Sequence, residues 1–186
     1  MTPGACDRVL LVGFMGSGKS SVGRAVAERL GWRFVDFDDE IVAEAGTSIP
    51  DIFRGKGEPH FRALENRVAR RLLAEKGVVL GSGGGWGAVP GRMSSEVPEG
   101  TASFWLRVSA PTAVKRAAGE PGARPLLAGP DPLEEASRLL SERERFYAEA
   151  QWTVDTEHCT VEDVAARILE ILKREHPEVL RACSNE

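Results

Sequence analysis

The sequence predicts an α/β fold in three layers, in which helices cover both faces of a five-stranded parallel sheet. Three observations carry this prediction. Short apolar runs alternate with segments of helical period along the chain. The run 9–12 is apolar at every position, as in a strand that is buried on both faces. A glycine-rich loop joins it to a helical segment, which is the element order of parallel sheets.

The ends of the predicted helices and strands are well marked in the first half of the chain. An apolar stripe at helical spacing predicts a helix over 19–30, and Gly31 follows as its left-handed end. A strand is expected over 34–38, and a short helix over 39–45 is closed by Gly46.

Two further helices are expected before the middle of the chain. Ser48 and Asp51 form a capping-box start for a short helix through Phe53. Pro59 suits a first helical position and opens a longer helix to about Lys76.

The second half repeats the alternation of elements. Strands are predicted over 78–80, 104–108 and 152–155, and helices over 109–118, 133–150 and 160–173. The last of these helices is capped by Thr160 with Asp163. Residues 118–132 are rich in glycine and proline without a period, which indicates a mobile loop. We expect one domain over 1–176 and a flexible tail over 177–186.

Composition restricts the classes of function. The net charge of −4 disfavours a nucleic-acid partner, which would select a basic face. The sequence has no apolar run near the ~20 residues of a membrane span and no secretory signal. The three cysteines are widely spaced, form no metal pattern and suit a reducing compartment. We therefore expect a cytoplasmic monomer with neither a nucleic-acid nor a membrane partner.

Residues 13–20 carry the strongest functional signal. They read Gly-Phe-Met-Gly-Ser-Gly-Lys-Ser, the P-loop signature G-x-x-x-x-G-K-S. Its glycines let backbone N–H groups turn inward on a phosphate chain, at the positive end of the next helix. The lysine adds charge for the β- and γ-phosphates and the serine hydroxyl is a ligand of Mg²⁺. We expect ATP to contact Gly16, Ser17, Gly18, Lys19, Ser20 and Ser21.

Asp36 and Asp38 stand at the carboxyl end of the strand predicted over 34–38. Residues i and i+2 of a strand point to the same face, so both carboxylates are expected to face the ligand crevice. Two like charges this close are costly unless a metal or an arginine lies between them. One suits the Mg²⁺ hydration shell and the other a proton from a substrate hydroxyl. The alternative is that they cap the next helix.

A second glycine-rich stretch, 81–85, follows the strand predicted over 78–80. It reads Gly-Ser-Gly-Gly-Gly, which lets the backbone approach a ligand closely, unless the loop is flexible and makes no contact. Ser82 occupies the place where many P-loop proteins have an aspartate. Asp36 is therefore the expected source of the carboxylate for Mg²⁺.

Three arginines are candidate anion ligands. Arg62 shares a helix face with Glu65, and near a helix start it opposes the dipole, which a bound anion would relieve. A surface ion pair is the alternative. Arg143 lies on an otherwise apolar stripe, where a charge pairs, faces a ligand or extends to solvent. Arg124 lies in the predicted loop over 118–132, where it can act from a lid.

Taken together, these features resemble the shikimate kinase family. The matching runs are Phe34-Val35-Asp36-Phe37-Asp38, Gly46-Thr47-Ser48-Ile49, Ile52-Phe53, Gly57-Glu58, Phe61-Arg62, Glu65, Gly83-Gly84-Gly85, Arg124-Pro125-Leu126-Leu127 and Arg143 with Tyr147. The resemblance covers about 9–156. It implies a P-loop kinase fold with a substrate-binding region at about 36–65 and a lid at about 117–132. It also implies transfer of the ATP γ-phosphate to the 3-hydroxyl of shikimate, with Mg²⁺, in the route to aromatic amino acids.

The resemblance implies a role for each matching residue. The implied catalytic residues are Asp38, which holds the reacting hydroxyl as candidate base, with Lys19 and Arg124 at the phosphoryl group. Ser20 and Asp36 are the implied Mg²⁺ residues, and Arg116 and Arg124 join the ATP contacts. The implied shikimate contacts are Asp38, Phe53, Phe61, Arg62, Glu65, Gly83, Gly84, Gly85 and Arg143.

Two stretches depart from the family pattern, and two other functions stay open. Trp86-Gly87-Ala88 follows the triple glycine, and residues 157–160 lack the usual Asn-Pro beside the adenine. A related small-molecule kinase, for gluconate or a nucleoside monophosphate, would not need two carboxylate-clamping arginines beside the aspartate pair. A nucleotide-sensing binding protein would not need Asp38 and the lid arginine together.

Overall fold

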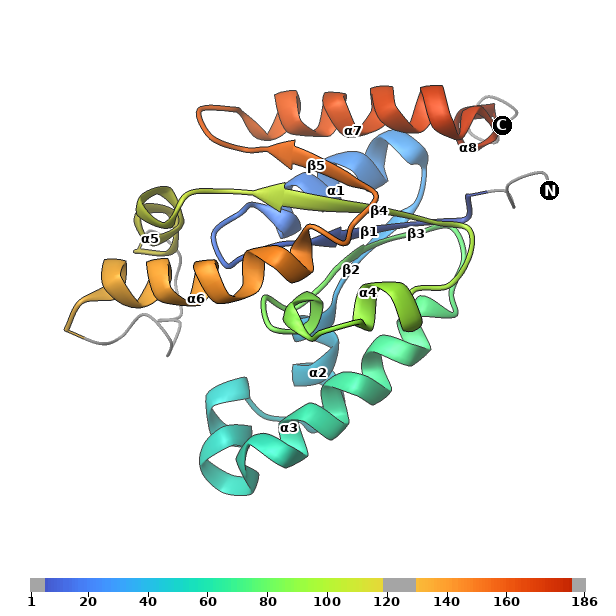
Figure 1. Cartoon of the computed structure of the whole chain (residues 1–186). Coiled ribbons are helices and arrows are strands. Elements are labelled where there is room, and N and C mark those ends of the chain that lie inside the picture. The colour runs from blue at the N-terminus through green and yellow to red at the C-terminus, as the bar shows by residue number, and fades with distance from the viewer. Residues whose placement is uncertain (1–5, 119–129, 182–186) are drawn as a thin grey trace.

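A five-stranded sheet forms the centre of the protein, with helices on both of its faces (Figure 1). The computed structural model describes residues 6–118 and 130–181. The strands are β1 (Arg8–Val12), β2 (Arg33–Asp36), β3 (Val78–Gly81), β4 (Thr101–Arg107) and β5 (Trp152–Asp155). The helices are α1 (Lys19–Leu30), α2 (Phe37–Ala45), α3 (Ile49–Leu73), the 3₁₀ turn η1 (Trp86–Ala88), α4 (Arg92–Ser95), α5 (Ala110–Ala118), α6 (Pro132–Tyr147), α7 (Val161–Glu175) and α8 (Pro177–Arg181). The predicted fold class is confirmed.

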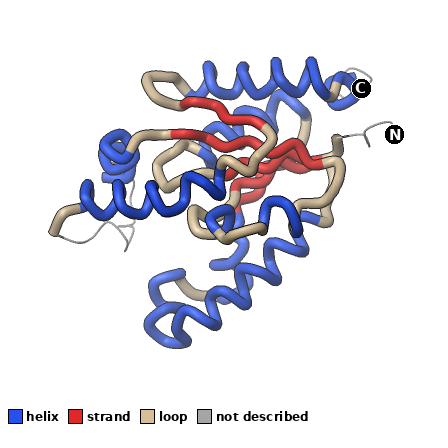
Figure 2. The backbone as a smooth tube through the Cα atoms, viewed as in Figure 1, coloured by secondary structure: helices blue, strands red, loops and turns tan. Residues whose placement is uncertain are grey.

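The strand order places the P-loop at a switch point of the topology. The order is β2-β3-β1-β4-β5, and all neighbours are parallel. Figure 2 shows the strands, in red, at the centre of the fold between the helices. From β1 the chain first builds β2 and β3 on one side and then β4 and β5 on the other. Open α/β sheets bind ligands beyond the carboxyl end of the strand where this reversal occurs. In this chain that strand is β1, which runs into residues 13–20.

The two faces of the sheet have separate apolar cores. In β1, Val9 and Leu11 pack in the core that also holds apolar residues of α1 and α7, while Leu10 and Val12 pack with those of α2, α3 and α6. In β4, Phe104 and Trp105 divide between the two cores in the same way. A strand covered on both faces needs apolar residues at every position, which is why β1 reads as a continuous apolar run.

The strand predicted over 34–38 is too long. β2 ends at Asp36 and α2 begins at Phe37, so Asp38 lies in the first turn of a helix. Asp36 is the N-cap of α2, because its side chain accepts a hydrogen bond from the backbone N–H of Asp38 over 3.0 Å. The argument that spacing along a strand sends both carboxylates to one face was therefore wrong.

The two helices predicted after Gly46 form one element, α3, with a break inside it. Gly57 has φ 77° and ψ 173°, which interrupts the helix just before Pro59. Its start is as predicted, because Ser48 Oγ accepts the backbone N–H of Asp51 over 3.3 Å. Its end, at Leu73, comes earlier than predicted.

The tail prediction needs correction at 177–181, which form α8. Val179 is only 3% exposed in the core that includes α7, and Glu178 Oε1 accepts the backbone N–H of Cys6 over 3.1 Å. Residues 182–186, and 119–129 of the predicted lid, lie outside the described residues. Across the residues that the structure describes, no helix is both long and apolar enough to cross a membrane.

Candidate active site

The P-loop bounds a pocket at the carboxyl end of β1. The residues that line this pocket are Gly16, Gly18, Lys19, Ser20, Ser21, Asp36, Asp38, Ser82 and Gly84. Gly16 has φ 70°, and a β-carbon on it would lie 2.6 Å from the carbonyl oxygen of Ala113, so only glycine fits. The Lys19 ammonium is largely buried and donates to the carbonyls of Gly13 and Phe14, both at 2.9 Å. The signature residues thus shape the loop that carries them.

Ser20 and Asp36 meet at the wall of this pocket. Ser20 Oγ donates to Asp36 Oδ2 over 2.7 Å, while the other carboxylate oxygen caps α2. Oxygen ligands suit Mg²⁺, which proteins hold through one or two carboxylates together with substrate phosphates. Within the ranges 6–118 and 130–181, no three His, Cys, Asp or Glu side chains gather into a metal site of their own. The donor set therefore fits a Mg²⁺ ion that is bound jointly with a nucleotide.

Asp38 faces the glycine-rich loop that follows β3. A β-carbon on Gly83 would lie 2.7 Å from Asp38 Oδ1 and 3.6 Å from Glu65 Oε1. A β-carbon on Gly85 would lie 3.2 Å from a guanidinium nitrogen of Arg62. The absence of side chains on this loop lets three charged groups approach its backbone. The loop is therefore in close contact with the predicted site residues.

Arg62 lies between two carboxylates of α3. Its Nη1 is 2.9 Å from Glu65 Oε2 and its Nη2 is 3.1 Å from Glu58 Oε1. Burial by itself lowers the pKa of Arg62, but the two carboxylates reverse this and leave the pKa raised. The side chain stays 39% exposed, so part of a permanent cation faces the loop of glycines. The ion pair that was the alternative interpretation is present, and the guanidinium also lies beside Gly85.

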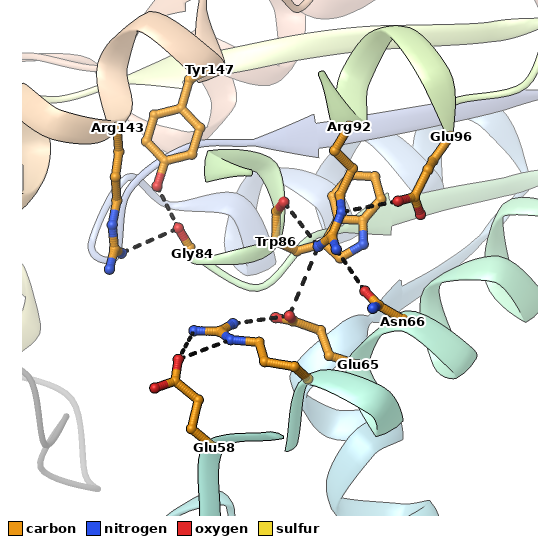
Figure 3. A network of polar contacts seen from close by, with 10 residues as sticks. Glu58, Glu65, Asn66, Gly84, Trp86, Arg92, Glu96, Arg143 and Tyr147 are labelled. Carbon is orange, nitrogen blue, oxygen red and sulfur yellow. Dashed lines mark hydrogen bonds and ion pairs between the residues drawn. The ribbon is translucent and has the colours of Figure 1, made fainter. Parts of the chain in front are cut away.

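Arg143 and Tyr147 reach the same loop from α6 (Figure 3). The Tyr147 hydroxyl donates to the carbonyl of Gly84, and Arg143 Nη1 donates to it over 3.5 Å. Burial raises the pKa of Tyr147 to about 12, so the hydroxyl keeps its proton at neutral pH. Arg62 from α3 and Arg143 from α6 thus approach the same glycine loop. Asp38, in the first turn of α2, lies against that loop as well.

A second pocket adjoins the first along the P-loop. It is lined by Gly16, Ser17, Gly18, Ser21, Val22, Arg116, Thr156, Cys159, Thr160, Val161 and Val164. Arg116 ties its two sides together, because it donates to the carbonyl of Thr156 over 2.8 Å and to that of Gly16 over 3.4 Å. Because both pockets share P-loop residues, one nucleotide can place its phosphates in the first pocket and its base in the second.

Three predicted site residues stand apart from this description. Arg124 lies outside the described residues. Phe53 and Phe61 contact each other, with ring centroids 4.7 Å apart, but they differ in exposure. Phe61 is buried in the core and Phe53 is 39% exposed, so only Phe53 offers a broad ring face to solvent.

The structure adds two residues that sequence reasoning missed or left without a role. Arg92 is buried in α4, and Trp86, noted only as a departure from the family pattern, is fully buried beneath it. The one signal for Arg92 was its spacing of four from Glu96, and that spacing is common on exposed helix faces.

Comparisons with known proteins agree on one family. The shikimate kinase family model matches residues 15–173. A shikimate kinase of Persephonella marina is 45% identical over 149 residues, which are 80% of this chain and 88% of that protein. A solved shikimate kinase from Acinetobacter baumannii, in complex with shikimate, gives a TM-score of 0.82 at 33% identity and covers 91% of this chain and 94% of its own. A gluconokinase from Sinorhizobium meliloti gives 0.55 at 22% identity over 91% of this chain and 97% of its own, a likeness of fold alone.

Proposed function

Since this chain belongs to the shikimate kinase family, we propose that it transfers the γ-phosphate of ATP to the 3-hydroxyl of shikimate. The products are shikimate 3-phosphate and ADP, and the reaction serves aromatic amino-acid biosynthesis. One observation carries the proposal: Asp38, Arg62 and Arg143 converge on the glycine loop 83–85, beside the P-loop.

The P-loop holds the phosphate chain of ATP. Its backbone N–H groups and the N-terminus of α1 face the β- and γ-phosphates, and Lys19 moves its ammonium from loop carbonyls onto phosphate oxygens. Ser20 and Asp36 would hold Mg²⁺, and the bound ion would neutralise charge on the phosphates. Arg116 and the second pocket hold the base side of the nucleotide.

The carboxylate of shikimate is held by Arg62 and Arg143. Planar guanidinium groups bind a carboxylate through paired charge-assisted hydrogen bonds, which also fixes the orientation of the ring. Gly83, Gly84 and Gly85 leave room for the ring beside the loop, while Glu65 orients Arg62. The exposed face of Phe53, backed by Phe61, covers the apolar side of the ring.

Asp38 accepts the proton of the reacting hydroxyl. Its carboxylate lies in the first turn of α2, at the boundary between the phosphate pocket and the glycine loop. Phosphoryl transfer depends mainly on alignment and charge, so Asp38 both holds the oxygen in line and takes its proton. Lys19 neutralises charge on the transferring group, and Arg124 joins it by resemblance to the family.

We also propose how the enzyme assembles and where it works. The enzyme acts as a monomer in the cytoplasm, without a nucleic-acid or membrane partner. Gel filtration with light scattering, with and without ligands, tests the monomeric state directly.

Activity assays with three acceptors test the function. The purified protein is given ATP and Mg²⁺ with shikimate, gluconate or AMP, and ADP release is measured by a coupled assay. We expect rapid release with shikimate alone, and phosphorus and proton NMR that locates the new ester at the 3-hydroxyl. Faster release with gluconate or AMP, or release that does not depend on any acceptor, would overturn the proposal.

A further inference from the structure

A buried arginine, Arg92, lies next to helix α3, which carries Arg62. Arg92 in α4 is 6% exposed and is not among the residues that line either pocket. Its guanidinium donates to the carbonyl of Trp86 over 3.3 Å and to Asn66 Oδ1 over 2.6 Å, and it stacks 5.3 Å from the Trp86 ring (Figure 3). A charged side chain this deep needs partners, and these two hydrogen bonds hold the guanidinium in place.

The same guanidinium faces two carboxylates. Arg92 Nη1 lies 3.9 Å from Glu65 Oε2, and its Nε lies 3.3 Å from Glu96 Oε1. Glu65 is only 2% exposed, and its Oε2 is also the partner of Arg62 at 2.9 Å. Arg62, Glu65 and Arg92 therefore form a chain of alternating charge that runs from the site into the core.

Trp86 connects this chain to the glycine loop. Its backbone N–H donates to the carbonyl of Gly83 over 3.0 Å, which closes the turn after the loop. Its ring packs edge-on against Phe37 at 5.4 Å between centroids, and Phe37 directly precedes Asp38. Arg92 thus contacts both the turn that shapes the loop and the carboxylate that orients Arg62.

We propose that Arg92 is a positioning residue for shikimate binding. The inference rests on the proposed function, because it takes Arg62 as a ligand of the substrate carboxylate. When that carboxylate engages Arg62, the buried Glu65 must share its partner, and Arg92 keeps Glu65 compensated and in place. Without Arg92, Arg62 is the one cation left close to Glu65 among the described residues, and Glu65 draws it away from the substrate. The loss therefore falls on shikimate affinity.

Two substitutions of Arg92 and one control test this role. Arg92→Met keeps the unbranched stem without charge, and Arg92→Lys keeps charge without the planar fork. Glu96→Gln weakens a different partner of Arg92 and serves as the control for general destabilisation. For each variant, shikimate dissociation constants come from calorimetry, KM values for shikimate and ATP from ADP release, and Tm from calorimetric scans.

We expect Arg92→Met to raise the Kd and KM for shikimate about tenfold to a hundredfold, as for remote residues that misplace a site, while the KM for ATP changes less than about twofold. Arg92→Lys restores part of the loss, and Glu96→Gln lowers Tm without a change in shikimate affinity. In a Glu65→Gln background the effect of Arg92→Met is much smaller, because a neutral amide no longer draws Arg62 inward.

A folded Arg92→Met protein with unchanged shikimate affinity, or with equal losses for shikimate and ATP, overturns the inference. If Arg92→Met does not fold, the same comparison is made with Arg92→Lys. Arg62→Ala distinguishes a failure of the proposed clamp from a failure of the positioning role. If it leaves shikimate affinity unchanged, the proposed clamp itself is wrong. If it weakens shikimate binding while the Arg92 variants do not, only the positioning role fails.

Discussion

The carboxylate of Asp38 lies directly against the backbone of Gly83: a β-carbon on that glycine would stand 2.7 Å from Asp38 Oδ1. Asp38 lies in the first turn of α2, just after strand β2, and Gly83 follows strand β3, which pairs with β2. The position of the candidate base therefore depends on a glycine about 45 residues away in the sequence.

Gly83→Ala should displace Asp38 and lower kcat/KM for shikimate by about tenfold to a hundredfold. ATP binding should change little, because the P-loop is untouched. Gly55→Ala is the matched control, since a β-carbon there meets nothing within 4 Å and alanine favours a helix. Steady-state kinetics for both substrates checks this, and normal shikimate kinetics in Gly83→Ala would contradict the tight contact.

Asp38→Asn should lower kcat by roughly 10²–10⁴, the usual scale for a general base. The amide keeps the size of the side chain but loses its charge and its ability to take a proton. Nucleotide affinity should survive, because Lys19 and Ser20 are unchanged. ADP release at saturating shikimate is measured with ATP binding in parallel. Turnover within a few-fold of wild type would remove Asp38 from the chemistry.

Arg62→Ala and Arg143→Ala should each raise the KM for shikimate strongly and leave ATP binding nearly unchanged. Loss of one partner of a buried charge pair costs on the order of 2–5 kcal/mol. Lysine should rescue poorly, because an ammonium does not reproduce the planar fork. Arg138→Ala is the control on α6, since Arg138 is exposed and pairs with glutamates of its own helix. Normal shikimate affinity in both alanine variants would refute the clamp.

Lys19→Ala should abolish turnover while the fold stays intact. The ammonium contacts two loop carbonyls and in the proposed mechanism moves onto phosphate oxygens. Catalysis of phosphoryl transfer depends mainly on such charge stabilisation. Circular dichroism establishes the fold and a coupled assay measures ADP release. Wild-type turnover in a well-folded variant would refute the P-loop assignment.

Glu157 should make the folding stability of the protein depend on pH in the acidic range. Hydrogen bonds from Thr112 and from the backbone N–H and hydroxyl of Ser109 lower the pKa of Glu157. Its stabilising effect is therefore fully present above the unfolded value of about 4.3 and disappears as pH falls through the lower folded pKa. Glu157→Gln should have a lower Tm near neutral pH, and the gap from wild type should close in acid. A gap that stays constant with pH would contradict the linkage.

The sequence by itself determined the features that depend on neighbouring residues. The P-loop, the five strands, and the caps at Ser48 and Thr160 were all predicted and found. Each is specified within a few residues, through backbone conformation, side-chain period or a local hydrogen bond. The ion pair of Arg62 with Glu65, which the sequence left open as an alternative, also depends on only one helical turn.

Other features were decided only by the tertiary structure. Asp38 was expected on a strand, but its backbone N–H donates a local capping bond to Asp36, so it lies in a helix. Only the pairing of β2 with β3 brings it to Gly83. The residues of α8 were predicted to be a flexible tail, but Val179 packs in the apolar core that also holds residues of α7. Arg92 reaches Asn66 and Glu65 only because α4 lies beside α3 in the fold. Such contacts join segments far apart in the chain, so they follow from which strands and helices become neighbours and not from any local pattern.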